Sequence, residues 1–544
     1  MTHLCVAIPV ETPDELEQAL ATAARCRQQG ATLVEWRVDA LGSQPHAAAH
    51  ITALVERSPL PCIVTVRGRD EGGLYAGTEA ERVELLCAVA RAQPAPAYID
   101  FELAQYQRSA SARQQIAAAT QPAGGPSAPR LIVSAHDFAG RPADLSRQVA
   151  AMAQLPECAV MKCAWQARSV RDNLEAFELL AARHKPTIAL CMGEAGVMSR
   201  VLAPKFGAFL TFARAGGAGD AEAAAAVALG TAAGQPSVAE LVGMYGFQRV
   251  GPGTRVYGVV GWPVAHSRSP ATHNAWFAQH AIDGVYVPLP VPPQYEHFKA
   301  SVGALLDAPP LAFRGASVTL PHKEHLIRLV RERGGRVEPI AARIGAANTL
   351  VVEDDGTLVC TNTDAPAAVD ALAAGMGVSV DALQDLRVAV LGTGGVARAV
   401  AAGIADAGGT AVVFSRQDSR AEALAQQLMS AEHPDEGMCG PLGGRVVAGR
   451  SSQLGCGCFH AFINCTPVGM QGGPDPTGSP LPDDVPLDDR VTVMDTVYAP
   501  PLTPLLQEAR ARGARTVDGL GMFYRQAARQ FERWTGVRPA PQQP

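Results

Sequence analysis

Residues 158–165 read Cys-Ala-Val-Met-Lys-Cys-Ala-Trp, an apolar run that holds one lysine, Lys162. Its length and apolar character favour a buried β-strand. Seven similar runs occupy the first half of the chain, at residues 4–10, 33–39, 61–67, 97–103, 130–138, 187–193 and 209–214. Helix-like stretches fill most of the gaps between them, as in βαβ units. Eight such units predict an N-terminal (β/α)8 TIM barrel within an α/β protein.

Polar side chains stand at the ends of several of these predicted strands. In barrels of this kind the βα loops at the C-terminal face of the strands build the active site. Lys162 lies in the sixth strand, where burial would disfavour a charged amine and favour a neutral one that attacks carbonyl groups. A structural ion pair with Glu35 or Glu102 is the alternative interpretation.

His136 ends the strand next to that of Lys162, which makes its imidazole a candidate general acid and base. A core histidine bonded to a backbone carbonyl is the alternative. Arg37, Arg67 and Arg200 are expected at the same mouth of the barrel. Since guanidinium groups bind carboxylates through two hydrogen bonds, they indicate an anionic substrate, unless they are solvated surface arginines.

Across residues 1–245 the chain resembles the type I 3-dehydroquinate dehydratases. The resemblance rests on Glu35-x-Arg37, Thr65-x-Arg67, the strand with Glu102, Ser134-x-His136-Asp137, Lys162 and Met198-Ser-Arg200. It implies that Lys162 forms a Schiff base with the substrate ketone, that His136 transfers the protons and that Glu102 orients His136. It also implies that Arg200 binds the substrate carboxylate, with Glu35, Arg37 and Arg67 as further substrate-binding residues.

One loop departs from the pattern of that family. The usual Ser-Ala-Pro-Gly-Gln reads Thr231-Ala-Ala-Gly-Gln235 here, and an alanine-rich insertion, residues 216–229, precedes it. Thr231 keeps a hydroxyl and Gln235 keeps the amide, so both are expected to cap the substrate.

A turn-rich stretch after Tyr245 separates a second half, in which residues 389–398 read Ala-Val-Leu-Gly-Thr-Gly-Gly-Val-Ala-Arg. Gly392, Gly394, Gly395 and Ala397 match the dinucleotide-binding fingerprint, with alanine at the third glycine position. The following strand ends in Ser415-Arg416, where NAD-binding proteins usually carry an acidic residue. Arg416 suits a 2′-phosphate and therefore favours NADP, with a solvated arginine as the alternative.

Nearer the start of this half, Ser267 and Ser269 precede a helix that Pro270 opens. Hydroxyls beside a helix N-terminus are suited to bind a carboxylate, although taken alone these residues favour simple N-capping.

The second half resembles the shikimate dehydrogenases over essentially its whole length. The matching strings are Ser267-Arg-Ser269-Pro, Ser317-Val-Thr319-Leu-Pro-His322-Lys323, Gly345-Ala-Ala-Asn348-Thr, Asn362-Thr-Asp364, Asn464-Cys-Thr466-Pro-Val-Gly-Met470, Asp495-x-x-Tyr498 and Asp518-Gly519 before Gln526. They imply that Lys323 and Asp364 form the proton-transferring pair, for which a plain salt bridge between domains is the alternative. Substrate binding is implied for Ser267, Ser269, Thr319, Asn348, Tyr498 and Gln526, and NADP(H) binding for Thr466 and Gly519 beside the fingerprint.

The resemblances imply three domains: a dehydratase barrel over residues 1–245, a substrate-binding domain over 254–365 that is completed by about 518–540, and a Rossmann-type NADP-binding domain over 366–517. They also imply that the product of the first reaction, 3-dehydroshikimate, is the substrate of the second, which would yield shikimate. A second half that prefers quinate is one alternative. Another is a ligand-sensing regulator without catalysis, which the retained catalytic residues disfavour.

Composition restricts the remaining possibilities. A net charge of −6 without a Lys/Arg block disfavours nucleic acid and anionic membranes as partners, which leaves small molecules. Neither a signal peptide nor a run of 18 apolar residues is recognisable, so a cytoplasmic location is expected. The twelve cysteines are expected to be reduced, and no metal site is assigned.

Overall fold

The computed structural model describes residues 2–216, 234–384, 386–429 and 445–540. Its contacts divide the chain into two units: the first comprises residues 1–259, 263–291 and 300–313, and the second comprises 260–262, 292–299 and 314–544. The domain limits given above remain a prediction.

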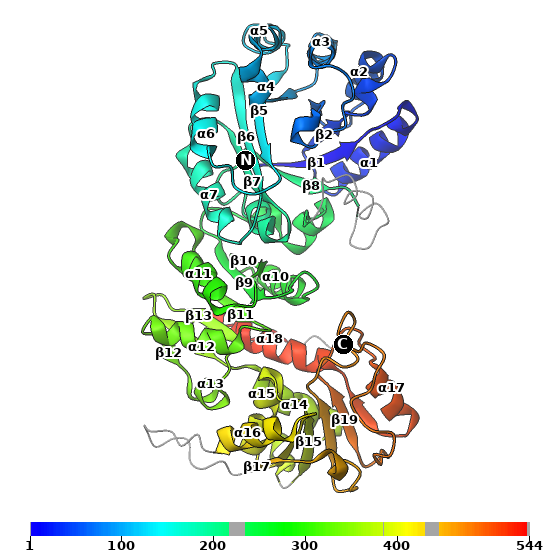
Figure 1. Cartoon of the computed structure of the whole chain (residues 1–544), viewed down its shortest axis with the longest axis vertical. Helices are drawn as coiled ribbons and strands as arrows, with labels where there is room; N and C mark the ends of the chain where they lie inside the picture. The colour runs from blue at the N-terminus through cyan, green and yellow to red at the C-terminus, as the bar shows by residue number, and fades with distance from the viewer. Residues whose placement is uncertain (1, 217–233, 385, 430–444, 541–544) are drawn as a thin grey trace. The chain divides into compact units, whose positions relative to one another are not determined.

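The first unit contains the eight-stranded barrel drawn from blue to green in Figure 1. Its strands run parallel in the order β7-β6-β5-β4-β3-β2-β1-β8, and Phe209 N donates to Thr187 O (2.8 Å) to bring β8 against β7. The strands are β1 (His3–Pro9), β2 (Leu33–Arg37), β3 (Cys62–Thr65), β4 (Tyr98–Glu102), β5 (Arg130–Asp137), β6 (Cys158–Gln166), β7 (Thr187–Met192) and β8 (Leu210–Arg214). The predicted barrel is confirmed, strand by strand.

Helices separate these strands along the chain. They are α1 (Leu16–Gln28), α2 (Ala47–Glu56), α3 (Glu79–Ala90), α4 (Leu103–Arg108), α5 (Ala110–Ala119), α6 (Leu145–Gln154), α7 (Asp172–Ala182) and α8 (Val197–Val201). Helix α3 begins with a capping box, in which the Thr78 hydroxyl accepts from Glu81 N and the Glu81 carboxylate accepts from Thr78 N.

Every second side chain of a strand faces the barrel interior, so residues two apart lie at successive levels of that interior. One level is apolar and the next is polar. An apolar cluster in the interior includes Cys5, Ile63, Tyr98 and Ile132. Two residues farther along β3, β4 and β5 stand Thr65, Asp100 and Ser134, and Lys162 pairs in register with Ser134. The polar level therefore lies toward the C-terminal ends of the strands, where barrels carry their active sites.

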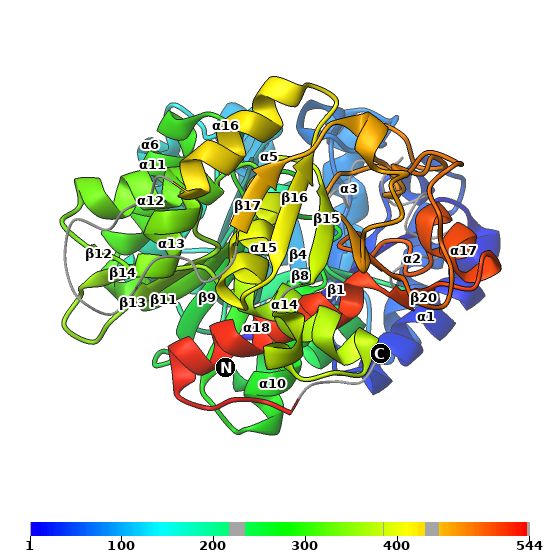
Figure 2. The same cartoon turned by 90° about the horizontal axis from the view of Figure 1, so that it is seen from below.

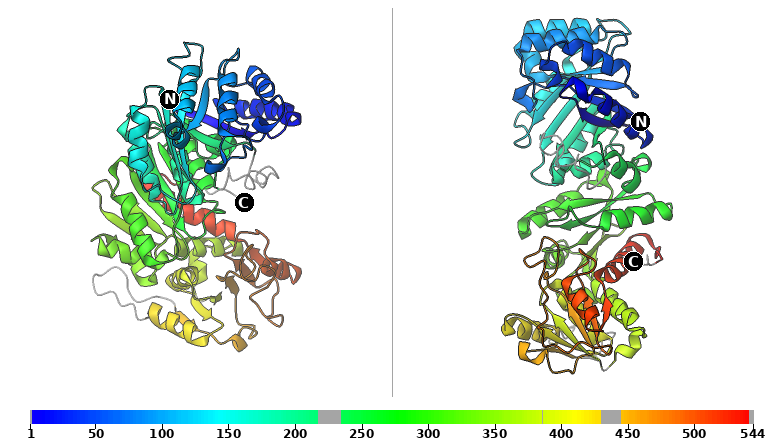
Figure 3. Two further views of the ribbon diagram at one scale, coloured as in Figure 1. Left: turned by 45° about the horizontal axis from the view of Figure 1, so that its top comes forward. Right: turned by 90° about the vertical axis from the view of Figure 1, so that its right-hand side faces the viewer.

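A second sheet has the strand order β10-β9-β11-β13-β14-β12 and is drawn in green in Figure 3. Its strands are β9 (Arg255–Gly261), β10 (Gly284–Pro290), β11 (Phe313–Val318), β12 (Arg336–Val337), β13 (Thr349–Val352) and β14 (Leu358–Thr361). Four helices accompany them: α10 (Ser269–Gln279), α11 (Tyr295–Leu306), α12 (Lys323–Glu332) and α13 (Pro339–Ile344).

The third sheet is parallel and has the order β17-β16-β15-β18-β19-β20, which is the 3-2-1-4-5-6 arrangement of dinucleotide-binding folds. Figure 2 shows β17, β16 and β15 side by side. It comprises β15 (Arg387–Leu391), β16 (Thr410–Phe414), β17 (Arg445–Ala448), β18 (Ala461–Asn464), β19 (Thr492–Asp495) and β20 (Arg515–Val517). The helices are α14 (Asp364–Met376), α15 (Gly395–Asp406), α16 (Asp418–Met429), α17 (Pro504–Ala511) and α18 (Gly519–Thr535). This sheet confirms the Rossmann-type prediction.

The cysteines differ from expectation at one place. Cys456 and Cys458 form a disulfide, with 5.4 Å between their Cα atoms. Nine other cysteines in the described part of the chain form no disulfide. Among the helices of the described residues, none is both long enough and apolar enough to cross a bilayer.

Candidate active sites

Lys162 lies inside the barrel with 4% of its surface exposed. Its Nζ is 2.9 Å from Asp100 Oδ2 and 3.3 Å from Glu35 Oε1, and it stands 4.7 Å from the centre of the Phe212 ring. The ion pair considered from the sequence therefore exists with Glu35, whereas Asp100 takes the place suggested for Glu102. Two carboxylates and an aromatic face hold this amine in one position.

Asp100 is the buried centre of this polar level. Arg67 Nη2 lies 3.0 Å from Asp100 Oδ1, and the Ser134 hydroxyl donates to the same oxygen at 2.6 Å. Burial by itself would raise the pKa of Asp100, but Arg67 and Lys162 outweigh that effect and hold the pKa well below its ordinary value. Asp100 is therefore a fixed negative charge beside the lysine.

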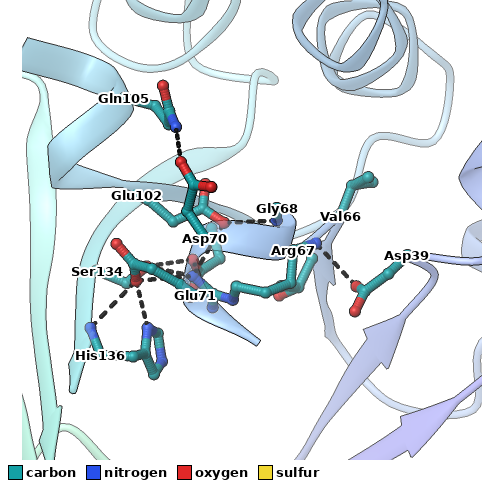
Figure 4. A network of polar contacts seen from close by, with 12 residues as sticks. Asp39, Val66, Arg67, Gly68, Asp70, Glu71, Glu102, Gln105, Ser134 and His136 are labelled. Carbon is teal, nitrogen blue, oxygen red and sulfur yellow. Dashed lines mark hydrogen bonds and ion pairs between the residues drawn. The ribbon is translucent and has the colours of Figure 1, made fainter. Parts of the chain in front are cut away.

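His136 is oriented by Glu71, a residue of the short helix Arg69–Glu71 after β3. Glu71 Oε2 lies 2.9 Å from His136 Nδ1 and accepts from His136 N at 3.1 Å, as Figure 4 shows. Burial, assisted by Arg67 and Lys162, lowers the pKa of His136 well below its ordinary value, so the ring is neutral. With Nδ1–H donating to Glu71, the ring presents Nε2 as the base.

The role expected for Glu102 needs correction, since Glu71 occupies the place beside the imidazole. Glu102 instead accepts from Arg82 Nη1 (2.7 Å) and from Gly68 N (3.0 Å), and it lies 3.3 Å from Arg67 Nη1. Arg82 is fully buried in α3 and holds the Glu102 carboxylate in an ion pair. Glu102 thus anchors the start of the loop that carries Glu71 (Figure 4).

Of the three arginines expected to face an anion, Arg200 is the one left without a carboxylate among the described residues. Arg200 as a residue is 4% exposed, its Nη1 donates to Phe212 O at 3.5 Å, and its Nε has no hydrogen-bond partner in the described part of the chain. Burial lowers its pKa to about 10. An anionic ligand would compensate this desolvated cation.

The other substrate-binding candidates of the barrel are already engaged or lie elsewhere. Arg67 is enclosed by carboxylates, and Arg37 pairs with Asp39 at 2.7 Å. Gln235 is buried, and its backbone carbonyl accepts from Arg214 Nε. Thr231 and nearly all of the alanine-rich insertion lie outside the described residues.

In the second unit, Lys323 and Asp364 form a buried pair with 2.6 Å between Nζ and Oδ2. Each is the first residue of its helix, α12 and α14 respectively. Asn348 Nδ2 donates to Asp364 Oδ1 (2.9 Å) and lies 3.4 Å from Gln526 Oε1. The structure therefore brings together four of the residues predicted for proton transfer and hydroxyl binding.

The remaining substrate-binding candidates lie at the ends of elements. Ser269 N donates to the Ser267 hydroxyl (3.2 Å), which places both serines at the start of α10. Thr319 directly follows β11, and its amide donates to Val260 O. Tyr498 packs on Phe523 of α18, with 5.2 Å between ring centres.

The turn after β15 fits a dinucleotide. Gly392 has φ +117°, and a Cβ there would lie 3.1 Å from Cys465 O and 3.2 Å from a Thr466 methyl carbon. A Cβ at Gly394 would meet nothing within 4 Å, which leaves open space at the N-terminus of α15. A Cβ at Gly395 would lie 3.2 Å from Lys323 Cδ, so the turn lies beside Lys323.

The other predicted cofactor residues are consistent with this arrangement. Ala397 is fully buried in α15, while Ser415 and the exposed Arg416 follow β16 directly. Gly519 begins α18 where a Cβ would lie 2.5 Å from Val497 O, so only glycine fits. Among the described residues, no cluster of metal-ligating side chains is found.

Profiles of known protein families match both halves of the chain. A profile described as type I 3-dehydroquinase matches residues 4–252, and one described as shikimate dehydrogenase substrate binding domain matches residues 259–350. Residues 387–440 match an NADP oxidoreductase, coenzyme F420-dependent, and residues 519–544 match the shikimate 5'-dehydrogenase C-terminal domain.

Individual relatives include a shikimate dehydrogenase (NADP(+)) of Paramagnetospirillum magneticum, 42% identical over 52% of this chain and 94% of its own. A crystal structure of shikimate 5-dehydrogenase from Thermus thermophilus with NADP(H) and shikimate covers 53% of this chain and 96% of its own, with 33% identity and a TM-score of 0.44. The chloroplastic bifunctional 3-dehydroquinate dehydratase/shikimate dehydrogenase of Arabidopsis thaliana is 33% identical over 97% of this chain and 82% of its own length. The chain therefore belongs to the family of bifunctional 3-dehydroquinate dehydratase/shikimate dehydrogenases.

Proposed function

We propose that this chain dehydrates 3-dehydroquinate to 3-dehydroshikimate in its barrel and reduces 3-dehydroshikimate to shikimate with NADPH in its second half. The observation that supports this most is the pair of buried lysines, Lys162 and Lys323, each in contact with its own carboxylate. One amine lies in a barrel beside a neutral histidine, and the other lies beside a glycine turn suited to a nucleotide.

In the dehydratase reaction Lys162 Nζ adds to the substrate ketone and water leaves, which produces an iminium cation. Asp100, held ionised 2.9 Å from that nitrogen, stabilises the positive charge. His136 Nε2 removes a proton from the carbon next to the iminium, and the resulting electron pair expels the hydroxyl on the following carbon. His136 returns its proton to that hydroxyl, which leaves as water. Hydrolysis then releases the product and restores the amine.

Substrate orientation in the barrel is assigned to Arg200, whose uncompensated guanidinium would bind the carboxylate of 3-dehydroquinate. Glu71 keeps His136 in the tautomer that leaves Nε2 free to act.

In the reductase reaction Lys323 donates a proton to the carbonyl oxygen as negative charge develops there, and Asp364 holds the ammonium in place. When bound, NADPH supplies the hydride. Gly392, Gly394 and Gly395 would hold its pyrophosphate, and Arg416 its 2′-phosphate. Asn348 and Gln526 would bind substrate hydroxyls.

Borohydride trapping and a coupled assay test both reactions in one chain. With 3-dehydroquinate present, borohydride is expected to reduce the Schiff base and label Lys162 covalently. Lys162→Ala is expected to abolish dehydration while 3-dehydroshikimate is still reduced with NADPH. Labelling at another lysine, or loss of both activities in a folded variant, would refute the assignment. Comparison of turnover on quinate and shikimate in the reverse direction decides between these two alcohols.

A further inference from the structure

Gln530 stands one helical turn after Gln526 on α18, and 1% of its surface is exposed. Its Nε2 donates to Asn348 O (3.0 Å) and to the Thr349 hydroxyl (3.0 Å), and its Oε1 accepts from the Ser317 hydroxyl at 2.7 Å. Both amide hydrogens and the amide oxygen are therefore used in a buried setting. This residue ties β11 and the start of β13 to α18.

The bonds of Gln530 converge on Asn348. The backbone oxygen of Asn348 accepts directly from Gln530 Nε2. The side-chain oxygen of Asn348 accepts from the Thr349 hydroxyl (2.8 Å), and this hydroxyl in turn accepts from Gln530 Nε2. On its other side Asn348 contacts Thr363 and Asp364, the residues that open α14. A continuous chain of hydrogen bonds thus runs from Gln530 through Asn348 to the carboxylate that pairs with Lys323.

We propose that Gln530 is a positioning residue of the reductase site, which fixes the side chain of Asn348 and, through it, the Lys323–Asp364 pair. The inference rests on the proposed reduction of 3-dehydroshikimate. Gln530 itself is enclosed by protein groups and acts through Asn348. Displacement of catalytic groups by about an ångström is enough to reduce turnover by about 100-fold. We therefore expect the reduction rate to depend on the hydrogen bonds of Gln530.

A matched control lies one turn farther along the same helix. Trp534 Nε1 donates to Leu350 O at 2.9 Å, so Trp534 ties α18 to β13 in the same manner but two residues beyond Asn348. Trp534→Phe removes that bond and keeps an aromatic ring. Gln530→Met keeps an unbranched side chain of similar size and removes the polar contacts. Both variants weaken the docking of α18, and only Gln530→Met releases Asn348.

The test measures steady-state reduction, dehydratase turnover and the melting temperature in full-length wild type, Gln530→Met and Trp534→Phe. For Gln530→Met, kcat/KM for 3-dehydroshikimate is expected to fall about 10-fold to 100-fold, with KM for NADPH within about twofold of wild type. Dehydratase turnover in the same chain should be unchanged. Trp534→Phe should lower the melting temperature but keep reductase kcat/KM within about threefold of wild type.

Three results would overturn the positioning role. The first is reductase kcat/KM of Gln530→Met within twofold of wild type, and the second is an equal loss of kcat/KM in Trp534→Phe. The third is an equal rise in the KM values of Gln530→Met for 3-dehydroshikimate and for NADPH. If Gln530→Met does not fold, Ser317→Ala decides, because it removes the hydroxyl held by Gln530 Oε1 and should cost about threefold to tenfold in kcat/KM. An unchanged rate in Ser317→Ala would also overturn the role. Wild type that fails to oxidise NADPH with 3-dehydroshikimate would instead sink the proposed function, and this inference with it.

Discussion

Replacing Glu71 with glutamine tests whether this loop residue, which no sequence pattern identified, controls the dehydratase base. The carboxylate accepts two hydrogen bonds from His136, at Nδ1 (2.9 Å) and at the backbone amide (3.1 Å). In Glu71→Gln an uncharged amide oxygen would take the same place, so the variant keeps the acceptor and removes its charge. A charge-assisted bond contributes about 1.5–3 kcal/mol and a neutral one about 1 kcal/mol. The difference of about 0.5–2 kcal/mol predicts a fall in kcat of roughly 2-fold to 30-fold.

The pH dependence provides a second measurement on the same variant. Burial, partly offset by Arg67, raises the pKa of Glu71 to about 7. Below that pH the carboxyl is protonated and loses the negative charge that strengthens its bond from His136 Nδ1–H, so dehydratase kcat/KM should fall as pH decreases through about 7. Glu71→Gln cannot titrate and should lose this acidic limb, leaving a lower but flatter profile.

Asp70→Asn is the control, because it makes the same change in charge on the neighbouring residue. Asp70 contacts Gln105 and Arg108 at the surface of the barrel rather than His136. Its dehydratase rate and its acidic limb should match wild type. The reasoning is wrong if Glu71→Gln keeps the wild-type rate together with a limb near pH 7, or if Asp70→Asn loses as much.

Three further substitutions follow from the same contacts. Arg200→Met removes the buried cation that lacks a carboxylate partner among the described residues, so KM for 3-dehydroquinate should rise about 10-fold to 100-fold while NADPH-dependent reduction is unchanged, as measured by steady-state kinetics. Gly392→Val places a β-branched residue at φ +117° against Cys465 O, and fluorescence titration should show NADPH binding weakened at least about 10-fold with intact dehydratase activity. Arg416→Ser should raise KM for NADPH about 10-fold and leave KM for NADH within about twofold, and equal changes for both cofactors would count against a 2′-phosphate contact.

The strands and most of their polar ends were predictable from sequence because both depend on local patterns. Alternation along β4 places Tyr98, Asp100 and Glu102 on one face, so the sequence already contained the information that Asp100 faces the barrel interior. What it lacked was the partner of each carboxylate. Glu102 turns to Arg82 of α3, and that choice depends on how α3 packs against the barrel. Sequence reasoning therefore found the right strand end and assigned it the wrong contact.

Glu71 was beyond such reasoning because its position depends on backbone geometry in a loop. Gly72 has φ +76°, and a Cβ at Gly73 would lie 2.0 Å from Arg67 O, so the chain folds back tightly just after Glu71. Glycine makes this reversal possible, but a glycine pair in a loop sequence does not specify the direction in which the preceding side chain points. Only the folded loop shows that the carboxylate reaches β5.

Gln530 and Glu71 share a feature that explains why both escaped the motifs. Groups proposed to touch substrate, such as Lys162 and Asp364, lie in short strings of sequence that identify them, whereas the groups that orient them come from distant segments. Glu71 is 65 residues from His136, and Gln530 is 182 residues from Asn348. On an amphipathic helix such as α18, a glutamine that completes a buried network and one that faces water have the same local surroundings in sequence. Orientation of a catalytic group is thus a property of the tertiary fold, and substitutions such as Glu71→Gln and Gln530→Met probe it while every residue proposed to react remains in place.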